Sequence, residues 1–294
     1  MTKFFTKLLL FTSFSFVISN IIIYILIANL ILPSTLPGGL IFGVLEKSKQ
    51  KTTADKVILG DSVGYEFLYG ANEKELKIHN LTSNQAVAMA GQYLFLKNAL
   101  EANPKQFKEV YLLCRHTTLS NNLEQPFTWN YFVRPLVTLE NMKIFTEDTK
   151  AKIKKSPFWW MVFIPMIRIN PVFPPVDYLS LNNTTPETPL FSFTTIEYAR
   201  KIRELCEKNN LKFYPIAMPV PEIFKPLKSF YEKEARAQMK KEGLEDMFDN
   251  FFKTITFLPD KLYRDGSHFN INFTIEERWD VINTILRDKK LPFK

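Results

Sequence analysis

The residues of this chain with the clearest chemical potential follow a short apolar run at 57–59. The sequence KVILGDSVGYEF (56–67) predicts a strand that runs into Gly60-Asp61-Ser62, followed by a helical turn. We expect Ser62 at the carboxyl end of a strand and the amino end of a helix. There its hydroxyl is exposed, and backbone N–H groups face any anion that forms nearby. This placement suits a serine nucleophile; the alternative is that Ser62 only caps an ordinary strand-to-helix turn.

A second group of polar residues lies near the C-terminus, in LYRDGSHFN (262–270). Asp265 and His268 are three positions apart, so a tight turn would let the carboxylate hold the imidazole. A serine hydroxyl is a poor nucleophile by itself, and a histidine base that an aspartate orients is the usual means of activating it. We therefore predict a triad of Ser62, His268 and Asp265. The alternative is that His268 is a histidine of a surface loop.

These two segments together resemble the SGNH (GDSL-type) hydrolase family, whose members are esterases and acyltransferases with a flavodoxin-like three-layer fold. GDSVG (60–64) is similar to the first sequence block of the family. DGSH (265–268) is similar to its last block, which supplies the Asp and the His of the triad. The resemblance covers residues 56–122 and 211–287 and implies the same three catalytic residues.

The resemblance also implies an oxyanion hole, in which hydrogen-bond donors bind the negative charge of a tetrahedral intermediate. Its first donor would be the N–H of Ser62 and its second the N–H of Asn84, with Gly91 as the alternative. The third block of the family is normally GxND, but this chain has LLCRHTTLSNNL (112–123) in its place. A side chain of this stretch would have to stand in for the missing asparagine: Asn121, Asn122 or His116.

The N-terminal segment 8–32 contains no charged side chain. Its 25 residues would form a helix of about 37 Å, longer than a hydrocarbon core of about 30 Å. A cleaved signal peptide is the alternative, with Lys3 and Lys7 as its basic region, but the apolar run is longer than is usual for such a peptide. We predict an uncleaved signal anchor over 1–35 and a linker over 36–54. The rest of the chain is then expected on the outer face of the cytoplasmic membrane.

Beyond the linker, apolar runs of strand length alternate with segments of helical periodicity. This alternation is typical of an α/β fold with a parallel sheet and helices on both faces. The resemblance makes the expected form a three-layer flavodoxin-like (SGNH) domain over 55–294. The predicted strands and helices are, in order, strands at 57–59, 78–81, 109–114 and 211–219, and helices at 87–103, 194–210, 226–243 and 274–287.

The stretch 119–193 interrupts this alternation, and we expect it to form a cap-like insertion in the domain. Its apolar and aromatic part, 157–175, is broken by Pro165, Arg168 and Pro171, so a second membrane span is not expected. The sequence leaves two interpretations open. The insertion either buries its aromatic residues as a lid, or it rests on the membrane or on a partner.

The overall composition narrows the chemistry further. The chain has 294 residues, and its formal net charge of 38 − 30 = +8 favours anionic surfaces. Because the basic residues are dispersed, nucleic acid is not implied as a partner. Two cysteines and three histidines leave little material for a disulfide framework or a metal cluster. We therefore expect no cofactor and no metal, and chemistry that uses side chains alone.

Three functions remain open. An anchor followed by an SGNH domain is similar to the layout of membrane-tethered SGNH proteins that modify cell-envelope polymers beside a membrane-bound O-acyltransferase. That resemblance implies O-acyl (O-acetyl) transfer from an acyl donor to a glycan or polyol hydroxyl. The first alternative is an esterase or deacetylase that releases acyl groups to water. The second is a non-catalytic SGNH-like protein that binds glycan or scaffolds an envelope complex.

Overall fold

The computed structural model describes residues 2–28, 38–125, 127–156, 159–168, 190–266, 268–269 and 275–290. The chain divides into two compact units. The first comprises residues 1–43 and 126–182, and the second comprises residues 44–125 and 183–294. Most of the predicted cap-like insertion therefore groups with the N-terminal helix, in a unit separate from the one that holds the sheet.

The first unit contains the long helix α1 (Thr2–Ala28) and short helices of the insertion. Residues Lys3–Leu26 of α1 form a stretch of 24 residues that is long and apolar enough to cross a membrane. Helix α9 packs against α1 within this unit. The insertion supplies η3 (Trp129–Val133), α7 (Arg134–Leu136), η4 (Asn141–Lys143), α8 (Glu147–Lys155), η5 (Trp159–Phe163) and α9 (Pro165–Arg168).

The predicted linker 36–54 contains a helix, α2 (Gly39–Ser48). Its apolar residues Ile41, Phe42, Val44 and Leu45 are buried. These positions repeat at helical spacing, but Gly39 and Gly43 fall among them and suggest a loop when the sequence is read alone. Burial of the apolar face outweighs the low helix propensity of glycine.

The second unit is built on a four-stranded sheet in the order β2-β1-β3-β4, in which all neighbouring strands run parallel. The predicted α/β fold with a parallel sheet is thereby confirmed. The strands are β1 (Lys56–Gly60), β2 (Ile78–Thr82), β3 (Glu109–Cys114) and β4 (Lys212–Ala217), all close to their predicted positions. A short parallel pair, β5 (Val220–Pro221) and β6 (Phe257–Leu258), lies beyond β4 in the chain.

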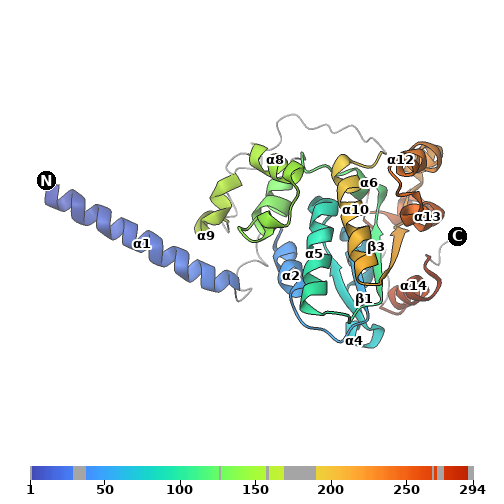
Figure 1. Cartoon of the computed structure of the whole chain (residues 1–294), viewed down its shortest axis with the longest axis horizontal. Coiled ribbons are helices and arrows are strands. Elements are labelled where there is room, and N and C mark those ends of the chain that lie inside the picture. Colours follow the sequence, from blue (N-terminus) through green and yellow to red (C-terminus); the bar gives the residue numbers. More distant parts are fainter. Residues whose placement is uncertain are drawn as a thin grey trace. The chain divides into compact units, whose positions relative to one another are not determined.

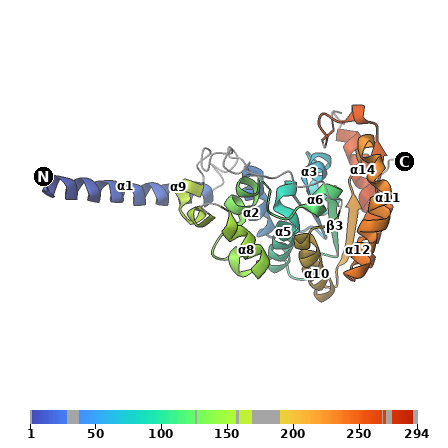
Figure 2. The same ribbon diagram turned by 90° about the horizontal axis from the view of Figure 1, so that it is seen from above.

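Helices cover both faces of this sheet, as Figures 1 and 2 show. On one face α5 (Ala88–Ala102) packs against α10 (Phe193–Lys208), whose N-cap is Ser192. On the other face lie α3 (Ser62–Leu68) and α14 (Ile275–Asp288). α13 (Glu245–Lys253) packs along the edge strand β4, where Asn250 donates to the carbonyl of Pro215 (3.0 Å). The remaining elements of the unit are α4 (Glu73–Leu76), η2 (Gln85–Val87), α6 (His116–Ser120), η7 (Glu222–Leu227), α11 (Lys228–Phe230), η8 (Tyr231–Ala235), α12 (Arg236–Lys241) and η9 (Asp260–Leu262).

The core under α3 and α14 fixes the edge of the sheet that carries the polar residues. Alternate strand residues such as Ile58, Tyr111 and Ile216 face this core because side chains of a strand alternate between its faces. They pack with Phe67 of α3 and Ile282 of α14 in one buried cluster. Since parallel strands end at the same edge, the segments that follow β1, β3 and β4 are brought together there.

Candidate functional site

The turn that carries Ser62 is shaped by two glycines. β1 ends at Gly60, and Ser62 is the first residue of α3. A Cβ atom on Gly60 would lie 2.2 Å from the carbonyl oxygen of Leu113 on β3, and one on Gly64 would lie 2.8 Å from the same oxygen. Only glycine permits so close an approach at these two positions. The GDSVG segment therefore packs directly against the end of the neighbouring strand.

The carboxylate of Asp61, which is fully buried, holds this turn in place. One oxygen, Oδ1, accepts hydrogen bonds from the N–H groups of Val63 (3.0 Å) and Gly64 (3.2 Å). The other, Oδ2, accepts from the N–H of Arg115 (2.8 Å) and the hydroxyl of Thr118 (2.7 Å). Asp61 thus caps α3 and joins it to the segment that follows β3.

The structure brings Ser62, His268 and Asp265 together within the second unit, across 206 positions of sequence. The Oγ of Ser62 lies 2.9 Å from Nε2 of His268. The Nδ1 of His268 lies 3.1 Å from Oδ1 and 3.0 Å from Oδ2 of Asp265. This is the connectivity of a nucleophile, a general base and a carboxylate that orients the base.

The turn that carries the imidazole is closed by its own backbone. The N–H of His268 donates to Asp265 Oδ1 (2.7 Å), and the N–H of Arg264 donates to the carbonyl of His268 (2.9 Å). Tyr263 and Phe269 form a β-bridge across the turn and stack with ring centroids 4.6 Å apart. Both of these rings belong to the core cluster that also contains Phe67 of α3. The core therefore fixes His268 relative to Ser62.

The contacts of His268 suit a triad histidine. In the neutral tautomer with its proton on Nδ1, the ring would donate to Asp265, and Nε2 would accept the hydroxyl proton of Ser62. The side chains of His268 and Asp265 are 26% and 51% exposed. Solvent reaches the site from this side, so the carboxylate is screened more than a buried triad aspartate would be.

The backbone at the start of α3 leaves one N–H group for a ligand. The first four N–H groups of a helix have no partner within it. Here the N–H of Asp61 donates to the carbonyl of Leu113 (3.1 Å), and those of Val63 and Gly64 donate to the Asp61 side chain. The N–H of Ser62 contacts no acceptor in the described part of the chain. It is the donor that a negative oxygen bonded to Ser62 Oγ would meet first.

Two of the predicted oxyanion donors differ in their placement. The N–H of Ser83 donates to the carbonyl of Gly60 (3.0 Å), so Asn84 follows directly beside the turn that carries Ser62. The Oδ1 of Asn84 accepts from the N–H of Ala86 (2.9 Å) and caps η2. Gly91 lies in α5 beyond its first three residues, where backbone N–H groups pair within the helix. Gly91 is therefore not available as a donor.

The asparagines predicted to replace the third sequence block serve the loop around them. Asn121 is buried; its Nδ2 donates to the carbonyl of Gln85 (3.1 Å), and its Oδ1 accepts from the N–H of Leu123 (3.1 Å). The Oδ1 of Asn122 accepts from the N–H of Glu124 (3.0 Å). Asn121 thus joins the segments after β2 and β3, which is a structural role rather than that of a free amide donor.

Sequence reasoning missed Arg115, which follows β3 directly. This arginine is 4% exposed. Its Nη2 donates to Oε1 of Gln85 (3.0 Å), and its Nε lies 3.9 Å from Oδ2 of Asp61 without a hydrogen-bond partner in the described residues. A buried cation therefore lies beside the turn of Ser62. The sequence signal for it is an arginine directly after a buried strand. A charged side chain is costly to bury at such a position unless polar groups partner it.

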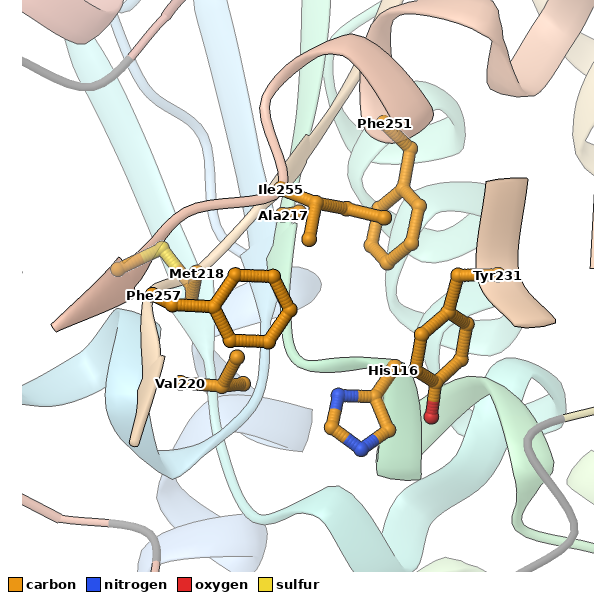
Figure 3. A pocket seen from close by; sticks show the side chains of 8 residues that line it. All are labelled: His116, Ala217, Met218, Val220, Tyr231, Phe251, Ile255 and Phe257. Carbon is orange, nitrogen blue, oxygen red and sulfur yellow. The ribbon is translucent and has the colours of Figure 1, made fainter. Parts of the chain in front are cut away.

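His116, another predicted stand-in, forms part of the wall of a mainly apolar pocket (Figure 3). Its ring lies 4.6 Å from that of Tyr231 and 5.8 Å from that of Phe224, measured between centroids. Burial, and next the charge of Arg115, lower the pKa of His116 to about 3. The imidazole is therefore neutral at physiological pH. The pocket is lined by His116, Ala217, Met218, Val220, Tyr231, Phe251, Ile255 and Phe257.

No group of three or more His, Cys, Asp or Glu side chains suited to a metal ion occurs among the residues that the structure describes. Comparison of the chain with protein-family models, with curated proteins and with solved structures finds no match.

Because two buried histidines have lowered pKa values, we predict that the protein loses stability in acid. Burial, and next the charge of Lys47, lower the pKa of His79 to about 4, and that of His116 is about 3. In the unfolded chain both pKa values return to about 6.5. As the pH falls below 6.5 the unfolded state takes up protons first, so each histidine destabilises the fold by up to about 2 kcal/mol at pH 5. The free energy of unfolding should decline steeply between pH 6.5 and 4.

This prediction is checked by denaturant unfolding at a series of pH values. The variant with both His79→Phe and His116→Phe should show a smaller slope of unfolding free energy against pH between 5 and 6. The slope is independent of any constant effect of the substitutions on stability. An unchanged slope in the double variant would contradict the assignment of the acid sensitivity to these two rings.

Proposed function

We propose that this protein is a serine acyl-ester enzyme of the SGNH type that transfers an O-acyl group, with acetyl as the simplest case, to a hydroxyl of a cell-envelope glycan or polyol. The observation that carries the proposal is the 2.9 Å approach of Ser62 Oγ to His268 Nε2, with Asp265 on the far side of the ring. The parallel sheet with helices on both faces supports a flavodoxin-like SGNH fold for this domain.

In the proposed reaction, Ser62 Oγ attacks the carbonyl carbon of the acyl donor while its proton passes to His268 Nε2. Asp265 holds the Nδ1 proton and stabilises the imidazolium that forms. The tetrahedral intermediate collapses as His268 returns the proton to the departing group, which leaves an acyl ester on Ser62. An acceptor hydroxyl then gives its proton to His268 and attacks the ester carbonyl. As the bond between the acyl carbon and Ser62 Oγ breaks, His268 returns this proton to Oγ, and the acyl group leaves on the acceptor.

The negative oxygen of each tetrahedral intermediate needs donors that are already in place. The N–H of Ser62 is the first of these, and the backbone beside Asn84 borders the same turn. We assign the third contribution to Arg115, in place of the asparagine of the missing GxND block. A buried guanidinium acts strongly on nearby charge because little water screens it. Its Nε hydrogen is also not used by the described residues.

The length and composition of α1 support an anchor in the membrane. In this proposal the second unit lies on the outer face, because Lys3 and Lys7 before the span favour the cytoplasmic side. An anchored enzyme remains close to an acyl-carrying membrane protein, and a membrane-bound O-acyltransferase is the partner that would supply the acyl group. The acceptor is then the envelope polymer on the same face. Transfer is favoured over release because both substrates are held near the membrane.

Hydrolysis is the second candidate, and the exposure of His268 and Asp265 favours it. Water that reaches the imidazole could replace the acceptor hydroxyl in the second half of the reaction. The same acyl-enzyme would then yield a free acid. The two outcomes differ only in whether water or an acceptor hydroxyl attacks the acyl ester on Ser62.

The role of Ser62 is tested by covalent labelling of the full-length protein in detergent with a fluorophosphonate probe. Wild-type protein should be labelled, because the probe reacts with a serine that a histidine activates. Ser62→Ala should not be labelled. Ser229→Ala, which changes an exposed serine on α11, should be labelled like the wild type. Equal labelling of the Ser62 and Ser229 variants would contradict the proposal.

The role of Arg115 is tested by steady-state kinetics on an activated ester. Arg115→Gln should lower kcat by about 10²–10³ with a much smaller change in KM, because the lost donor acts on the transition state. Arg115→Lys should keep part of the rate, since it keeps the charge. Arg203→Gln, at a surface arginine paired with Asp246, is the control. A kcat within twofold of wild type for Arg115→Gln, in a variant that unfolds at the wild-type temperature, would count against the assignment.

Transfer and hydrolysis are separated by product analysis. Purified full-length protein is given an isotopically labelled acetyl ester together with envelope glycan or glycerol. Transfer predicts that the label appears on the acceptor in preference to free acetate, and that Ser62→Ala abolishes both products. Release of free acetate at the same rate with and without acceptor would identify an esterase instead.

A further inference from the structure

The segment that follows α8 in the first unit leaves an unusual amount of apolar surface open. Nine successive residues, Trp159–Ile167, carry no polar side chain, and among them only Val162 is buried. Trp160 and Phe163 are 52% and 38% exposed. Contiguous apolar surface of this kind marks a contact with a partner or a membrane.

This segment is fastened to the apolar helix α1. The N–H of Met166 donates to Oδ1 of Asn20 (3.0 Å), and Nδ2 of Asn20 donates to the carbonyl of Phe16 (2.8 Å). Both ends of this amide in an otherwise apolar helix therefore have partners. Pairing of this kind is required where lipid surrounds the chain, because lipid offers no hydrogen bonds.

The point of attachment lies within the candidate span Lys3–Leu26 of α1. This span is not buried in the protein, and α9 packs against α1, so the apolar surface of α1 continues onto Trp159–Ile167.

Cations border the segment on both sides. Lys154 and Lys155, at the end of α8, are exposed just before it. Arg168 follows it and donates to the carbonyls of Arg134 (2.8 Å) and Pro135 (2.7 Å). Basic side chains at the edges of an apolar surface face acidic lipid headgroups, and aromatic residues such as Trp160 favour the same depth.

From these contacts we infer that Trp159–Arg168 is a second membrane element, which lies in the bilayer interface beside α1 and contacts acidic phospholipid. The occupant of the exposed apolar surface is lipid, because that surface continues onto a helix that is itself long and apolar enough to span a membrane. α1 and the segment thus form one membrane-binding surface, joined through Asn20 and Met166.

The inference is tested by spin labelling of the full-length protein in vesicles of phosphatidylglycerol and phosphatidylcholine. Nitroxides are placed at Trp160→Cys and Phe163→Cys, with Leu139→Cys as the matched control. Leu139 is an apolar residue of the same unit, 74% exposed and outside the segment. The native Cys114 and Cys206 are buried, and protein without an added cysteine measures any background from them.

Collisions with oxygen, which dissolves in lipid, and with a water-soluble nickel complex report the surroundings of each label. For each label we compare the ratio of relaxation by oxygen to relaxation by nickel. This ratio should be roughly tenfold higher at 160 and 163 than at 139, because the interface excludes the aqueous complex. Strong relaxation by nickel would place the segment in water. Weak relaxation by both would place it against protein, either a partner or a second copy. Either of these results would overturn the inference.

A second variant tests the link to α1. Asn20→Leu keeps the helix apolar but removes the acceptor of the Met166 N–H. The label at 160 should then become several-fold more accessible to nickel, whereas the label at Leu139 should not change. Unchanged accessibility at 160 would show that the Asn20 contact does not hold the segment in place. None of these readouts depends on the proposed catalytic activity.

Discussion

The site depends on one buried carboxylate. Asp61 accepts four hydrogen bonds, two from the first turn of α3 and two from the segment that follows β3. A buried charge is costly unless its hydrogen bonds are made, so this geometry is strongly specified. It sets the position of Ser62, the next residue, and it also places Arg115. Ser62, the proposed nucleophile, and Arg115, the proposed donor to the oxyanion, are therefore positioned by the same side chain.

Gly60 and Gln92 further fix the end of β1, directly before Asp61. The side-chain amide of Gln92, buried in α5, donates to the carbonyl of Gly60 (2.9 Å) and accepts from its N–H (3.2 Å). Gly60 has no side chain because the carbonyl of Leu113 occupies that space. The end of β1 is thus held by a neighbouring strand and by a helix on one face of the sheet. His268, in contrast, comes from a partly exposed turn, which Tyr263 and Phe269 tie to the core.

The two units contain different groups of the residues discussed above. The first contains α1 and the aromatic segment Trp159–Arg168, and the second contains the sheet and the three residues of the proposed triad. The described helices of the insertion group with α1. The surface inferred to contact lipid and the residues proposed to do chemistry are therefore built from separate cores.

The sequence alone determined the features that arise from local pattern. Alternating apolar strands and amphipathic helices predicted the parallel α/β sheet. The short spacing of Asp265 and His268 predicted their contact, since a tight turn is enough to make it. Only the tertiary structure decided which groups surround Ser62. The side-chain amide of Asn121 is chemically suitable as a donor but is used by the carbonyl of Gln85, while Arg115 gains its place through Asp61. It also decided that α2 is a helix and that the insertion joins α1. The physical reason is that these outcomes depend on burial and on hydrogen bonds between residues far apart in the chain, which no local pattern records.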